Sequence, residues 1–119
     1  FPFWFKNCEN TNEIGKILSA ADLAIIGSGL TRYETAFLGT PSIVFSKNDE
    51  HEKMVCSFAD TGAVLSGGVL SKISSAEMAE MIINVIYDEE LRKSMSAAGP
   101  SIIDGNGAKR LAALITQLV

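Results

Sequence analysis

A glycine-rich turn between an apolar strand and a short helix is the part of this sequence best suited to chemistry. The apolar residues 23–26 lead into Gly27-Ser28-Gly29, and a helix is predicted to open at Thr31 and to stop at Gly39. The first N–H groups of a helix have no partner inside it, and the helix dipole is positive there. A phosphate or diphosphate fits such a place. The turn therefore indicates a nucleotide or nucleotide-sugar site.

The same turn also has a purely conformational explanation. It departs from the dinucleotide fingerprint GxGxxG, because Arg32 stands where Gly or Ala is expected, and no Gly-Lys-Ser/Thr follows as in a Walker A loop. The two glycines could simply supply the positive φ angles of a tight turn. From the residues alone both interpretations remain open.

Two side chains just inside the predicted helix carry the same ambiguity. Glu34 could accept hydrogen bonds from a ribose, but Thr31-x-x-Glu34 is also a capping box, and the residues alone favour the cap. A capping glutamate would have no acceptor left for a ligand. Arg32 could pair with a ligand phosphate, although extension into solvent is the simpler expectation.

A polar segment follows the next predicted strand. Residues 46–51 read Ser-Lys-Asn-Asp-Glu-His, and ligands of open α/β sheets gather at the carboxyl ends of the strands. The segment could contact a sugar, or it could be a solvated loop with Asn48 or Asp49 as the cap of a helix. His51, the single histidine, is a candidate acid/base group near neutral pH, or an ordinary surface histidine.

Apolar runs alternate with helical patterns along the chain, which predicts an α/β fold with a Rossmann-like parallel sheet of about four strands flanked by helices. Strands are expected at residues 1–5, 23–26, 43–45 and 63–65, the last closed by Gly67-Gly68. Helices are expected from Asn10 or Thr11, across 49–60, after the Ser74-x-x-Glu77 capping box, from Asp88 to Gly99-Pro100, and after the 104–107 turn. The last three are extra helices at the C-terminus.

Composition limits the possible functions. The chain has 119 residues, enough for one domain, and its net charge of −4 argues against a large nucleic-acid interface. It contains no apolar run of the roughly 18 residues that a membrane span needs. Cys8 and Cys56 are expected to be free thiols in a reducing cytoplasm, and they form no metal-binding spacing with His51. We expect neither a metal ion nor a cofactor.

Residues 21–44, ADLAIIGSGLTRYETAFLGTPSIV, resemble the C-terminal domain of GT-B-fold nucleotide-sugar enzymes. The similarity continues through Ala59-x-x-Gly62-Ala63 and ends in Asp104-Gly105-x-Gly107-Ala108-x-Arg110. That last motif is similar to one branch, the UDP-sugar hydrolase of pseudaminic acid biosynthesis and its spore-coat polysaccharide relatives. MurG-type glycosyltransferases are also similar. The resemblance covers nearly the whole chain from about Thr11.

The resemblance implies a set of binding residues. Amides near Ser28, Gly29, Leu30 and Thr31 would hold the diphosphate of a UDP-sugar, and Glu34 would hold the ribose hydroxyls, which reverses the expectation from the residues alone. The remaining members, Asp49, Glu50 and His51, would approach the sugar. Here the sequence departs from the hydrolase-like pattern, which has Asn-Gln in place of Glu50-His51.

The resemblance also implies that residues 1–119 are one truncated domain of a larger bacterial cytoplasmic enzyme of surface polysaccharide or nonulosonic sugar biosynthesis. The start of the chain has no initiator Met and no signal peptide. In the hydrolase branch the catalytic histidine belongs to an N-terminal domain, so the chain alone should be inactive. Two alternatives remain: a glycosyltransferase that passes the sugar to a lipid or saccharide, and a non-catalytic α/β interaction domain. An exposed sheet edge could pair two copies.

Overall fold

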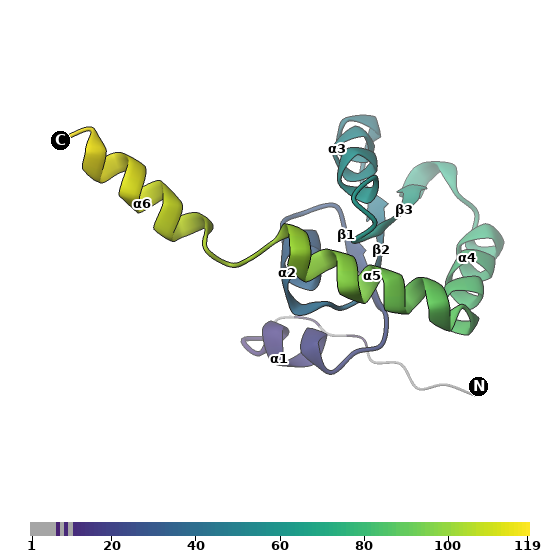
Figure 1. Ribbon diagram of the computed structural model, residues 1–119. Helices are drawn as coiled ribbons and strands as arrows, with labels where there is room; N and C mark the ends of the chain where they lie inside the picture. The colour runs from purple at the N-terminus through teal and green to yellow at the C-terminus, as the bar shows by residue number, and fades with distance from the viewer. Residues whose placement is uncertain (1–6, 8, 10) are drawn as a thin grey trace.

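The computed structural model describes Asn7, Glu9 and residues 11–119, and it shows a parallel sheet covered by helices (Figure 1). Three strands lie in the order β1-β2-β3: β1 (Ala24–Gly27), β2 (Ser42–Ser46) and β3 (Leu65–Val69). The helices are α1 (Ile14–Ser19), α2 (Thr31–Leu38), α3 (Asp49–Ala59), the 3₁₀ turn η1 (Leu70–Lys72), α4 (Ser75–Tyr87), α5 (Glu89–Ile102) and α6 (Gly107–Gln117). The predicted α/β class with a Rossmann-like parallel sheet is confirmed.

The central strand β2 holds the two halves of the core together. Every residue of β2 is buried, as expected for a parallel strand covered on both faces. Val44 packs with the cluster that includes Ala36 of α2 and Val55 of α3. Its neighbours Ile43 and Phe45 pack with the cluster around Val85 of α4. Alternation along one strand thus places α2 and α3 on one face of the sheet and α4 on the other.

One strand prediction stays untested and another needs a correction. The strand expected at residues 1–5 lies outside the described residues, so three strands are seen instead of about four. The strand expected at 63–65 runs over Leu65–Val69, and Gly67 and Gly68 lie inside it. A Cβ atom on Gly67 would lie 2.4 Å from the ring of Phe45, and Gly68 has φ 92°, beside a register shift in the pairing with β2. Gly67 leaves room for the Phe45 ring, and Gly68 allows the irregular pairing with β2. Both glycines therefore belong to the strand and do not end it.

Several predicted helix ends are confirmed by hydrogen bonds. Gly39 ends α2 in the left-handed conformation, with φ 71°. The side chain of Asn48 caps α3 by accepting the His51 N–H at 2.9 Å. The Ser74 hydroxyl caps α4 by accepting the Glu77 N–H at 3.1 Å. These caps are local signals, which a sequence pattern can reveal without any knowledge of the fold.

Two other helix ends differ from the prediction. Gly99-Pro100 does not stop α5, which continues to Ile102. Gly99 lies instead at the contact with α2, where a Cβ atom would be 2.2 Å from the Ala36 carbonyl oxygen. The first helix begins at Ile14 instead of near Thr11, whose hydroxyl accepts the Glu13 N–H; Asn10 lies outside the described residues.

The last helix projects away from the body of the molecule (Figure 1). All residues of α6 are exposed, including Leu111, Leu114 and Ile115. The 104–107 turn that precedes it is held by Asp104, whose carboxylate accepts hydrogen bonds from the Asn106 N–H and from Arg110. The Arg110 hydrogen bond holds the pKa of Asp104 below its usual value. Within the described part of the chain, no helix is long and apolar enough to cross a membrane.

Candidate functional site

The turn between β1 and α2 presents free amide groups to solvent. Gly29 and Leu30 are exposed, and Leu30 occupies the N-cap position without a side-chain cap. Among the described residues, the N–H groups of Gly29, Leu30 and Thr31 have no hydrogen-bond acceptor. The N–H groups of Leu30 and Thr31 are orphan donors of the kind expected at a helix start, and the exposed Gly29 precedes them.

The glycines of the turn have no conformational or packing role in the described chain. Neither Gly27 nor Gly29 has a positive φ, so the interpretation of a turn that requires one is wrong. A Cβ atom at either position would meet nothing within 4 Å. The space that a side chain would fill at Gly29 is therefore open to a ligand that approaches the backbone closely.

Glu34 is not engaged in a capping box. Because Leu30 is the N-cap, Thr31 is the first helical residue and Glu34 stands one position too far along to bond back to the cap. The side chain is exposed, and its carboxylate has no hydrogen-bond partner among the described residues. The capping prediction is wrong, and both carboxylate oxygens are available to a ligand.

Ser28 and His51 lie together, although 23 positions separate them in the sequence. The Ser28 hydroxyl lies 2.9 Å from Nδ1 of His51, and the Ser28 carbonyl oxygen lies 3.3 Å from the same nitrogen. The Lys47 N–H also donates to the hydroxyl, at 3.4 Å. The pair joins the carboxyl ends of β1 and β2, the sheet edge where ligands of this fold class gather.

The Ser28–His51 pair is less than a catalytic triad. A serine nucleophile needs a base within hydrogen-bond reach and a third group that orients the base. The distance meets the first condition, but no carboxylate among the described residues bonds to the imidazole of His51. Ser28 is also buried, at 7% exposure. The geometry supports a role in fixing the site and gives no separate evidence for catalysis.

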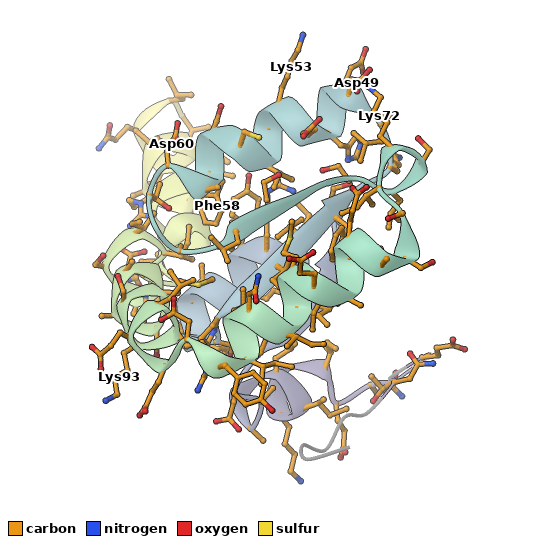
Figure 2. The ribbon with its side chains drawn as sticks, turned by 90° about the vertical axis from the view of Figure 1, so that its right-hand side faces the viewer. Asp49, Lys53, Phe58, Asp60, Lys72 and Lys93 are labelled. Atoms are coloured by element: carbon orange, nitrogen blue, oxygen red, sulfur yellow. The ribbon has the colours of Figure 1, made fainter. Side chains whose placement is uncertain are left out.

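Three acidic residues open α3, and one of them, Asp49, is engaged in an ion pair. Asp49 forms an ion pair with Lys72 of η1 at 2.6 Å, and Figure 2 shows the two side chains close together. The Asp49 hydrogen bond and charge raise the pKa of Lys72. Glu50 is exposed, and it shares the first turn of α3 with Asp49 and Glu52. Three carboxylates at this helix start repel an anion, whereas α2 has only Glu34 in its first turn.

Arg32 is buried, although its position in the sequence predicted exposure to solvent. It is only 5% exposed, so the expectation that it extends into solvent is wrong. Its guanidinium Nη1 donates to the carbonyls of Ser28 and Gly29 at 2.9 and 2.7 Å, and Nη2 donates to the Tyr33 hydroxyl at 2.9 Å. The signal that could have revealed this is the position of a long fork-shaped donor three and four residues after the carbonyls of a turn.

The predicted binding residues line neither of two hollows near α2. One hollow of about 400 Å³ lies beside them and is lined by Arg32, Tyr33, Met54, Ser57, Phe58 and Thr61. Another, of about 410 Å³, lies at the opposite end of α2, beside Gly39. Neither is lined by Ser28, Glu34 or His51. The site as described has one wall, and a ligand on it would need a second surface to be enclosed.

The chain is similar to one curated protein along nearly its whole length. That protein is the spore coat polysaccharide biosynthesis protein SpsG of Bacillus subtilis (strain 168), which is 28% identical over 114 residues. The similarity covers 96% of this chain, which spans about a third, 34%, of the relative's length. No protein-family profile matches the chain, and no solved structure matches it significantly.

Proposed function

We propose that this chain is the nucleotide-sugar-binding part of an enzyme of bacterial surface polysaccharide or nonulosonic sugar biosynthesis. The observation that carries the proposal is the β1–α2 turn: unpaired amides at a helix start, open space above Gly29, and the unengaged carboxylate of Glu34 one turn further on. The amides of residues 28–31 would bind the diphosphate, and Glu34 would accept hydrogen bonds from the ribose hydroxyls. The name of the similar protein, SpsG, supports a place in polysaccharide biosynthesis.

The proposed reaction of the whole protein is UDP-sugar hydrolysis. Water would attack the anomeric carbon, and UDP would leave with the bonding electron pair. Preorganised amides at the positive end of α2 would stabilise the charge that develops on the leaving diphosphate. His51 and Glu50 would lie toward the sugar, with Ser28 holding the His51 ring in place. The chain covers 34% of its relative, which leaves room for a domain that supplies the opposite wall and the catalytic base.

A titration of the full-length protein with UDP tests the nucleotide site. We expect Glu34→Ala to weaken UDP binding by about 10- to 100-fold, because a hydrogen bond to a charged group contributes roughly 1.5–3 kcal/mol. The matched control is Glu77→Ala, which removes the same charge from the first turn of α4, on the other face of the sheet. Equal UDP affinities for the two variants and the wild type would refute the role given to Glu34.

A further inference from the structure

We infer that Arg32 is a positioning residue for the diphosphate: its buried guanidinium holds two carbonyls of the β1–α2 turn from beneath and so aims the neighbouring N–H groups at the ligand. The inference rests on the proposed function and extends it to a residue outside the predicted set. Three observations carry it: the hydrogen bonds of Arg32, the absence of a compensating charge, and the contrast with a second arginine of the same chain.

The hydrogen bonds of Arg32 fix the orientation of two peptide planes. The Ser28 carbonyl shares its plane with the N–H of Gly29, and the Gly29 carbonyl shares its plane with the N–H of Leu30. In a trans peptide the C=O and the N–H point in opposite directions. Because Arg32 Nη1 binds both carbonyls, at 2.9 and 2.7 Å, the N–H groups of Gly29 and Leu30 must point away from it, and both residues are exposed.

The charge of Arg32 is not neutralised within the described chain. Its hydrogen-bond acceptors among the described residues are neutral: two carbonyls and the Tyr33 hydroxyl. The Tyr33 ring centroid lies 4.5 Å from the guanidinium carbon. None of the ion pairs of the described residues includes it, and its buried Nε has no hydrogen-bond partner. A buried, unpaired cation is costly, and at a helix N-terminus it also opposes the dipole. An anion on the turn would offset both costs.

A second arginine shows what a purely structural role looks like. Arg92 also donates to two backbone carbonyls, those of Val85 and Ile86, in the last turn of α4. At that end of a helix a cation is favourable, so Arg92 needs no ligand. Arg32 makes the same kind of contact at the unfavourable end. The other buried side-chain polar atom without a partner among the described residues, Ser46 Oγ, also lies at this edge, next to Lys47.

The test compares UDP with UMP in calorimetric titrations of the full-length protein, because the two ligands differ by the β-phosphate. In Arg32→Met we expect the wild-type preference for UDP over UMP to fall about 10-fold or more, the size of effect seen when a charge-assisted contact is lost. In Arg32→Lys, which keeps the charge but not the fork, we expect an intermediate preference. Arg92→Met is the matched control and should leave the preference unchanged while lowering the Tm.

The outcomes separate this inference from the proposed function. If the wild type prefers UDP and Arg32→Met keeps that preference in full, the role of Arg32 is refuted and the nucleotide site stands. If the wild type binds neither ligand, the proposed function fails, and the inference fails with it. If Arg32→Met does not fold, Arg32→Lys decides: an undiminished preference in that variant overturns the positioning by the guanidinium fork.

Discussion

At Gly29 we expect a substitution to weaken ligand binding without lowering the stability of the protein. Its φ is not positive, and a Cβ atom there would meet no atom within 4 Å, so the described chain has no need of a glycine at this place. The free N–H groups beside it give a reason why a side chain would interfere with a ligand. Because the described fold does not require a glycine here, Gly29 is the position where the proposed diphosphate site can be tested most directly.

We therefore expect Gly29→Ala to leave the free energy of unfolding unchanged or to raise it by about 0.4–1 kcal/mol, because alanine restricts the unfolded chain. UDP affinity should fall about 10-fold or more, as expected when a methyl group displaces a charged contact. Chemical denaturation and UDP titration of the same variant measure the two effects. Gly15→Ala in α1, where a Cβ atom also meets nothing, is the control that should not change UDP binding. Unchanged UDP affinity in Gly29→Ala would contradict the close approach of a phosphate.

At the scale of elements, the contact between α2 and α5 supports the helix that carries the site. Gly99 of α5 lies against the backbone of Ala36, and Pro100 lies near Gly39 at the end of α2. The helix continues through the proline, since the Ile103 N–H still bonds to the Gly99 carbonyl at 3.0 Å. Close packing of the two helices therefore holds α2 at the end opposite the amide turn.

Gly99→Ala should destabilise the protein by about 1–3 kcal/mol, the usual effect of overpacking, because its Cβ atom would lie 2.2 Å from the Ala36 carbonyl oxygen. The contact is with backbone, which cannot move aside as a flexible side chain can. Thermal and chemical denaturation measure the loss. Gly107→Ala at the start of α6 is the matched control, because a Cβ atom there meets nothing. Equal stability of the two variants would show that α2 and α5 can separate without cost.

At the scale of the whole molecule, the described chain would form one wall of the proposed site, and all residues of its last helix, α6, are exposed. The proposed binding residues Ser28, Glu34 and His51 line neither of the two hollows near α2, and α6 exposes Leu111, Leu114 and Ile115. The strand β1 pairs only with β2 among the described residues, so pairing of two copies through this edge stays a prediction. The chain spans 34% of the length of SpsG, so further protein is available in the relative to cover these surfaces.

The proposed hydrolysis depends on the whole protein, because we place its catalytic base in protein beyond residues 1–119. We expect the full-length protein, incubated with UDP-sugars alone, to release free sugar and UDP, and the 119-residue chain to release none. Chromatography of the products measures both. If sugar transfer by the full-length protein requires a lipid or saccharide acceptor, the enzyme is a glycosyltransferase. If no UDP-sugar is turned over or bound, a non-catalytic domain is the better description.

The sequence by itself determined the elements whose signals are local. Gly39 ends α2, Asn48 caps α3 and Ser74 caps α4, because each acts on backbone groups within four residues of itself. The apolar runs likewise determined a parallel sheet, and its central strand β2 is buried on both faces, as the lack of polar alternation predicts. The edge strand β1 does not follow this pattern, because Ile25 is half exposed.

Only the tertiary structure decided which side chains meet. The burial of Arg32, the contact of Ser28 with His51 and the passage of α5 through Gly99-Pro100 all depend on partners brought close by strand register and helix packing. Glu34 shows the difference within one residue: its pattern fits a capping box, but the N-cap falls on Leu30 and leaves the carboxylate free. The capping-box pattern is local and present in the sequence, but the hydrogen bonds that it predicts are absent at the start of α2 in the described chain.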